Sequence, residues 1–161
     1  MTVEPLRREH WDAVQRIYLE GIATGNATFQ TTAPEWEQWD HGHLPACRLV
    51  ALEGDRVVGW AALSPVSSRC VYGGVAEVSI YVEEKARGAG VGKRLLTALI
   101  DASEAAGLWT LQAGIFPENT ASVELHRKCG FRLVGVREKM GKMNGRWRDV
   151  CLMERRSAVV N

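Results

Sequence analysis

A glycine-rich segment in the middle of the chain constrains the fold and the chemistry most strongly. Residues 87–92 (RGAGVG) follow the β-rich run Val75 to Val82 and precede an amphipathic pattern that ends at Gly107. Between a strand and a helix, unpaired backbone N–H groups and the helix dipole favour an anion, and glycines let the backbone approach it closely. With Lys93 and Arg94 following, the segment predicts a loop that binds a phosphate group.

Two common phosphate motifs do not fit this segment. A Walker A loop would need a glycine five residues before Gly92 and a Ser or Thr after Lys93, but these positions hold Arg87 and Arg94. A dinucleotide fingerprint beginning at Gly88 would need its third glycine where Lys93 stands, and it would belong to an opening βαβ unit. The sequence therefore disfavours a nucleoside triphosphatase and a dinucleotide-dependent enzyme.

Periodicity along the rest of the chain predicts an α+β or α/β fold, in which a mixed sheet is flanked by helices. Strands are expected at 3–6, 48–53, 56–63, 75–82 and 108–115, and helices at 11–22, from Pro34, from 91 to Gly107, and from Asn119 to Cys129. Gly54-Asp55 and Asn144-Gly145 predict hairpin turns. No repeat or linker interrupts the order, so residues 1–161 are expected to form a single domain.

Composition narrows the class of partner. Twenty basic and nineteen acidic residues leave a net charge of +1, which predicts neither a nucleic-acid partner nor an anionic membrane partner. No apolar run approaches the ~20 residues of a membrane span and the N-terminus lacks a signal-peptide pattern, so we expect a cytoplasmic protein. Cys47, Cys70, Cys129 and Cys151 stand far apart, which favours free thiols and no metal site.

The pattern Arg-x-x-Gly-x-Gly at 87–92, with this order of strands and helices, strongly resembles the GNAT superfamily of N-acetyltransferases over nearly the whole chain. The resemblance implies a mostly antiparallel mixed sheet whose fourth and fifth strands splay apart, with acetyl-CoA in the splay. It also implies that the strand end offers backbone groups to the pantetheine amides while the loop holds the pyrophosphate. The cofactor-binding residues expected on this basis are Ile80, Tyr81, Val82, Arg87, Gly88, Ala89, Gly90, Val91, Gly92, Lys93, Asn119 and Lys128.

Residues 119–131 (NTASVELHRKCGF) are similar to the last helix of that superfamily. Taken alone, Asn119 is a helix N-cap as readily as a cofactor contact, and Lys128 is a solvated helix residue that only the resemblance places near the cofactor. His126 stands where many relatives have a Tyr that is taken to protonate the leaving thiolate. His126, Glu77 and the closing GRWRD make the chain resemble the phosphinothricin acetyltransferase group, whose members acetylate amino-acid analogues and are typically homodimers.

The chemistry of acetyl transfer assigns candidate roles to these residues. An ammonium cannot attack a thioester, so the enzyme must deprotonate an amine whose pKa is about 8. Glu77 could act as the base directly or through water, or it could be a half-buried carboxylate satisfied by an Arg. His126 could gain or donate a proton, or be a histidine satisfied between sheet and helix.

Phe29, Arg69 and Tyr72 are the candidate acceptor-binding residues, because a cation and an aromatic wall suit an anionic small molecule. A surface Arg and two core aromatics are the alternative. We therefore expect an N-acetyltransferase that moves the acetyl group of acetyl-CoA, by direct attack on the thioester, to the α-amine of a small molecule such as phosphinothricin, methionine sulfoximine or methionine sulfone. Acetylation of protein N-termini or lysines, and an acetyl-CoA sensor without turnover, are the other hypotheses.

Overall fold

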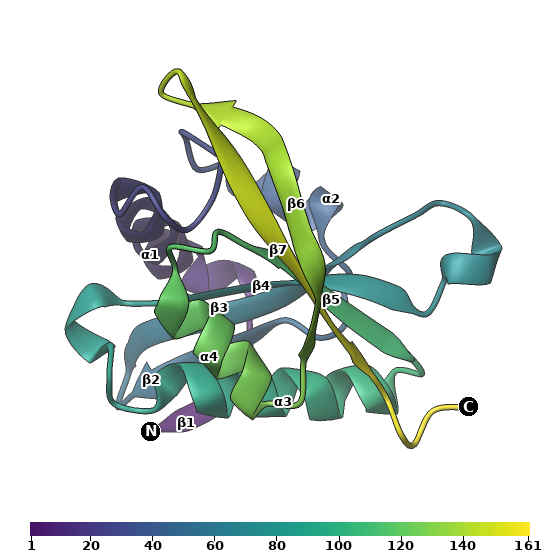
Figure 1. Ribbon diagram of the computed structural model, residues 1–161. Coiled ribbons are helices and arrows are strands. Elements are labelled where there is room, and N and C mark those ends of the chain that lie inside the picture. The colour runs from purple at the N-terminus through teal and green to yellow at the C-terminus, as the bar shows by residue number, and fades with distance from the viewer.

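A seven-stranded sheet forms the centre of the structure, a computed structural model that describes residues 1–161 (Figure 1). The strands are β1 (Thr2–Pro5), β2 (Leu49–Glu53), β3 (Arg56–Pro65), β4 (Val75–Val82), β5 (Thr110–Ile115), β6 (Arg132–Met143) and β7 (Arg146–Arg156). Their spatial order is β1-β2-β3-β4-β5-β7-β6. The β4–β5 pair is parallel and the other five pairs are antiparallel, which confirms the predicted mixed, mostly antiparallel sheet.

Helices cover both faces of the sheet and create two apolar cores. The helices α1 (Trp11–Ala23) and α2 (Trp36–Gly42) bury Trp11, Val14, Ile17 and Trp39 against one face. On the other face lies α3 (Val91–Ala105), whose apolar stripe packs on β3 and β4, with α4 (Thr120–Lys128) beside it. Strand residues alternate between these cores, as a pleated strand requires: Trp60 and Ala62 belong to the first, and Ala61 and Leu63 to the second.

Short-range turn signals predicted the element boundaries well. Asn144 and Gly145 have φ values of 52° and 75°, as expected for the two central residues of a tight turn between β6 and β7. Gly107, with φ 82°, follows the end of α3 and confirms the predicted stop. The predicted start of the second helix at Pro34 is wrong by two residues, because Glu35 remains extended (φ −78°, ψ 165°) as the N-cap of α2.

The central opening of the sheet lies between β4 and β5. These strands pair only where Val75 to Glu77 face Thr110 to Gln112. Beyond this point β4 stays paired with β3 as far as Val82, and β5 stays paired with β7 as far as Ile115. The predicted splay is therefore present, and it leaves the facing edges of both strands without a strand partner. None of the helices combines the length and apolar composition needed to cross a bilayer.

Candidate active site

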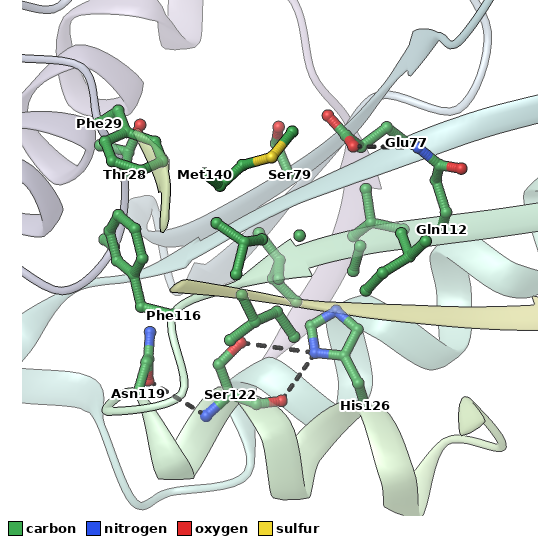
Figure 2. Close-up of a pocket in the computed structure, with 18 of the residues that line it drawn as sticks. Thr28, Phe29, Glu77, Ser79, Gln112, Phe116, Asn119, Ser122, His126 and Met140 are labelled. Atoms are coloured by element: carbon green, nitrogen blue, oxygen red, sulfur yellow. Dashed lines mark hydrogen bonds between the residues drawn. The ribbon is translucent and has the colours of Figure 1, made fainter. Parts of the chain in front are cut away.

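Two adjoining clefts occupy the opening between β4 and β5. The loop cleft, of about 460 Å³, is lined by the end of β4, the glycine-rich segment 86–92 and the first half of α4. The Glu77 cleft, of about 430 Å³, extends from Glu77 past His126 to the β6–β7 hairpin (Figure 2). The residues that line both clefts are Ala27, Ile80, Tyr81, Asn119 and Ser122. Molecules bound in the two clefts would therefore meet.

Six consecutive backbone N–H groups, from Gly88 to Lys93, donate no hydrogen bond within the protein, and Arg94 N–H begins the helical ladder by donating to Gly90 O at 3.2 Å. Gly88 and Gly90 have φ values of 81° and 82°, and a Cβ at either would meet no atom within 4 Å. The loop thus presents free donors and the positive end of α3 to an open space, which fits a pyrophosphate.

The predicted cofactor residues fall into three groups in the structure. Residues that line the loop cleft are Ile80, Tyr81, Val82, Arg87, Gly88, Gly90, Val91, Gly92 and Asn119. Ala89 and Lys93 contribute free N–H groups without lining it. Lys128 lies exposed at the end of α4 and lines neither cleft, so its assignment has no support in the structure.

A strap, defined as residues 24–30 between α1 and α2, contributes to both clefts. Arg148 holds it from β7, donating to Gly25 O and to Asn26 Oδ1 at 2.9 Å each. The same guanidinium lies 4.0 Å from the centre of the Phe116 ring and pairs with Glu118 at 3.2 Å. The strap is therefore tied across the opening to the segment that follows β5.

Asn119 completes this attachment. Its Oδ1 accepts from Ser122 N–H at 3.3 Å, which confirms the predicted N-cap of α4, and its Nδ2 donates to Asn26 O at 3.2 Å. Both polar atoms of the side chain thus have protein partners. The side chain can cap the helix and line the clefts together, as the sequence suggested.

Glu77 lies on the last paired rung before the splay, directly opposite Gln112. Gln112 Nε2 donates to Glu77 Oε1 at 3.3 Å, and the carboxylate is half-buried at the end of its cleft (Figure 2). The alternative of a carboxylate satisfied by a neighbouring Arg is wrong, since its partner is an amide. A half-buried carboxylate with one neutral donor remains able to accept a proton.

His126 enters the same cleft from α4 and is 1% exposed. Its Nδ1 lies 2.7 Å from Ser122 O, and because a carbonyl oxygen can only accept, Nδ1 must carry the hydrogen. Nε2 then has a free lone pair and no partner in the protein. Burial lowers the pKa of His126 below its usual value, so the neutral ring is favoured near pH 7 and Nε2 is a proton acceptor.

An aromatic wall faces these groups. Phe29 from the strap meets Phe116 edge to face, with ring centres 4.8 Å apart. Phe29 also covers Gly141 so closely that a Cβ there would lie 3.0 Å from its Cζ. Met140 and Arg137 of β6 complete this part of the Glu77 cleft.

Arg69 and Tyr72, the other two predicted acceptor residues, are not brought to the clefts. They lie on the exposed segment that joins β3 to β4, which Figure 1 shows extending away from the sheet. The Arg69 guanidinium lies 5.6 Å from the centre of the Tyr72 ring. Neither residue lines the loop cleft or the Glu77 cleft. Within a single chain they contact each other and lie outside both clefts, so their contact with the acceptor stays a prediction.

Sequence reasoning missed several residues of the Glu77 cleft, chiefly Gln112, Ser122, Arg137 and Met140. Gln112 could have been found by aligning the parallel strands on either side of the glycine loop. The other three residues reach the cleft through contacts between segments far apart in the chain, which no local pattern predicts.

A splayed sheet, a loop of free N–H groups at a helix N-terminus and a carboxylate in the adjoining cleft together fit an acetyl-CoA-dependent acyltransferase. Comparison with known proteins leads to the same class. Residues 8–131 match the Acetyltransferase (GNAT) family, and the chain belongs to this family.

Two curated relatives indicate the branch of the family. The chain is 34% identical to a phosphinothricin N-acetyltransferase of Alcaligenes faecalis over 163 residues, covering 96% of this chain and 81% of the relative. It is 38% identical to an L-methionine sulfoximine/L-methionine sulfone acetyltransferase of Pseudomonas aeruginosa over 98 residues, covering 61% and 57% of the two chains. The resemblance to the phosphinothricin acetyltransferase group is therefore confirmed.

Solved structures agree with this placement. A phosphinothricin acetyltransferase from Sinorhizobium meliloti, crystallised with acetyl-CoA, has a TM-score of 0.86 at 31% identity, with 96% of this chain and 87% of that chain covered. A ribosomal-protein-alanine N-acetyltransferase from Brucella melitensis has a TM-score of 0.89 at 30% identity, with 98% and 100% covered. The protein is thus an N-acetyltransferase with acetyl-CoA as its co-substrate.

Proposed function

We propose that the protein acetylates the α-amine of a small amino-acid analogue of the phosphinothricin, methionine sulfoximine or methionine sulfone type. One observation carries the proposal: the cleft that adjoins the phosphate loop combines a carboxylate, a cation and an aromatic wall in about 430 Å³. This volume suits a small molecule, and the mixture of charges suits a zwitterion. The names of the two curated relatives point to the same acceptors.

The residues of this chain would divide the reaction as follows. The six free N–H groups of 88–93 would hold the pyrophosphate, and the open edge of β4 at Ile80 to Val82 would hold the pantetheine arm. Acetyl-CoA supplies an activated thioester. Glu77 would take a proton from the acceptor ammonium, directly or through one water, and so free its lone pair for attack on the thioester carbonyl.

Two further groups would serve the later part of the reaction. Backbone N–H groups left open where β4 departs from β5 would stabilise the oxyanion that forms on the carbonyl oxygen. As the carbon–sulfur bond breaks, the thiolate leaves and takes up a proton. His126 Nε2 would accept the proton that the amine nitrogen releases after attack, since its lone pair is free; as the resulting imidazolium it could return that proton to the thiolate.

We also propose that residues 1–161 form one domain and that two copies associate. Support for the homodimer comes from the edge strand β6, on which Leu133, Val134 and Val136 are each 44–48% exposed. Exposed apolar side chains on an edge strand favour association with another chain. Sedimentation equilibrium at micromolar concentration should give twice the mass of the chain, and a monomer mass would contradict the proposal.

The second candidate is acetylation of protein N-termini, which the likeness to the ribosomal-protein-alanine N-acetyltransferase structure favours. A competition assay separates the two. Purified protein and acetyl-CoA are incubated with methionine sulfone, its decarboxylated amine and an alanine-initiated peptide, and products are identified by mass spectrometry. We expect methionine sulfone to have the highest kcat/KM. A preference for the peptide would establish the second candidate instead.

A further inference from the structure

Arg137 is the one Lys or Arg among the residues that line the Glu77 cleft. Its guanidinium forms no hydrogen bond or ion pair within the chain. Two other arginines of the β6–β7 hairpin are already engaged, since Arg132 pairs with Glu154 and Arg148 pairs with Glu118 and holds the strap. A cation that lines the cleft without an intramolecular partner is free to meet a ligand.

The pairing of β6 with β7 directs Arg137 towards the cleft. Arg137 lies opposite Val150, and Gly135 lies opposite Leu152. Val150 and Leu152 both line the Glu77 cleft, and directly opposed residues of antiparallel strands share a face. The side chain of Arg137 therefore belongs to the cleft face of the hairpin.

A bulge follows the rung that carries Arg137. Between the pairs Arg137–Val150 and Gly141–Arg148, β6 has three residues where β7 has one. Lys139 takes φ 48° there, and its N–H donates to Asp149 Oδ1 at 2.9 Å. The bulge brings Met140 to the cleft and Gly141 beneath Phe29, directly after the rung that carries Arg137. Bulges near active sites commonly redirect side chains in this way.

The charges of the cleft are complementary to an α-amino acid. Glu77 supplies a negative charge from β4, while Arg137 supplies a positive charge from β6, with the aromatic wall between the strap and β6. Without Arg137, the cleft would present Glu77 alone to an acceptor carboxylate and would repel it. A guanidinium can bind that carboxylate with two parallel hydrogen bonds.

We propose that Arg137 binds the carboxylate of the acceptor and thereby selects α-amino acids over simple amines. The proposal rests on the proposed function and adds a specificity residue to it. It assigns to Arg137 the role that the sequence had suggested for Arg69. The ammonium would then lie at the Glu77 end, and the acceptor side chain would lie against Phe29, Phe116 and Met140.

The test compares Arg137→Gln and Arg137→Lys with the wild-type protein on methionine sulfone and on its decarboxylated amine. Arg132→Gln is the matched control, because Arg132 lies on the same strand and lines neither cleft. We expect Arg137→Gln to lower kcat/KM for methionine sulfone on the order of 10²-fold, mainly through KM, and to change the value for the amine by less than about threefold. Arg137→Lys should lower kcat/KM for methionine sulfone by a smaller factor, because lysine keeps the positive charge but lacks the planar guanidinium that makes two parallel hydrogen bonds.

The possible results test the assignment of Arg137 and the proposed function separately. Equal losses on both substrates, or an Arg132→Gln protein as impaired as Arg137→Gln, would overturn the assignment of Arg137. So would unchanged kinetics of Arg137→Gln on methionine sulfone, although the proposed function would then stand. If the wild-type protein fails to acetylate methionine sulfone and acetylates the peptide, the proposed function fails as well. Thermal unfolding and acetyl-CoA calorimetry should be unchanged in both Arg137 variants, because Arg137 is exposed and has no partner to lose.

Discussion

Two glycines flank helix α3, and a comparison of their alanine variants distinguishes the effect of backbone strain from the loss of phosphate binding. Gly90 precedes the helix and Gly107 follows it, both have φ 82°, and at both an added Cβ would meet no atom within 4 Å. A non-glycine residue in the left-handed region costs about 1–2 kcal/mol. Gly90→Ala and Gly107→Ala should therefore lower the free energy of unfolding by similar amounts, ~1–2 kcal/mol each.

Cofactor affinity should separate the two variants. The Cβ at Gly90 would project into the open space beside the six free N–H groups, where a phosphate oxygen must lie, whereas Gly107 is at the opposite end of the helix. A hydrogen bond to a charged group contributes about 1.5–3 kcal/mol. The loss of one such bond in Gly90→Ala raises the Kd for acetyl-CoA about 10- to 10²-fold, and Gly90→Val should bind more weakly still.

Calorimetry with coenzyme A at fixed ionic strength measures the affinity, and urea unfolding measures the stability of the same preparations. Gly107→Ala should bind coenzyme A as the wild-type protein does. If both alanine variants bind within about twofold of wild type while showing the expected loss of stability, the pyrophosphate does not lie on residues 88–93. That result would remove the assignment of the whole loop cleft.

Two further predictions concern proton transfer and pH. Glu77→Gln keeps the contact with Gln112 but removes the base, so kcat should fall by roughly 10²–10⁴ with the KM for acetyl-CoA unchanged; a change confined to the acceptor KM would show that Glu77 only orients the acceptor. Burial lowers the pKa of His126 in the folded state, whereas in the unfolded chain it is about 6.5. Its contribution to stability is present above about pH 6.5 and is lost as the pH falls below that value, because only the unfolded chain gains the proton readily. Urea unfolding at pH 7.5 and pH 5.5 should show a smaller loss in His126→Asn than in wild type, and equal losses would contradict this account.

Residues that act through local geometry were predictable from the sequence. Asn119 caps α4, Gly107 ends α3 and Asn144-Gly145 forms its turn, because each conformation depends on the residue itself and its nearest neighbours. The face of β4 that carries Glu77 is also a local matter, since Glu77 alternates with the core residue Val78 and shares its face with Ser79.

Residues whose place depends on long-range pairing were not predictable in this way. Arg137 reaches the cleft because β7 inserts between β5 and β6, and because a bulge follows it. No local sequence pattern predicts the strand order or the position of the bulge, because both depend on contacts between distant segments. Arg69 was chosen for its charge and its position before β4, but chain proximity to Glu77 did not bring it to the cleft.

The strap has a consequence for how the two substrates influence each other. Residues 24–30 contribute to both clefts and belong to no helix or strand, and the side chains of Arg148 and Asn119 hold them in place. A ligand that orders or displaces the strap from one cleft must change the free energy of binding in the other. Thermodynamic linkage makes this effect reciprocal: whatever factor acetyl-CoA applies to the affinity of the acceptor, the acceptor applies to acetyl-CoA.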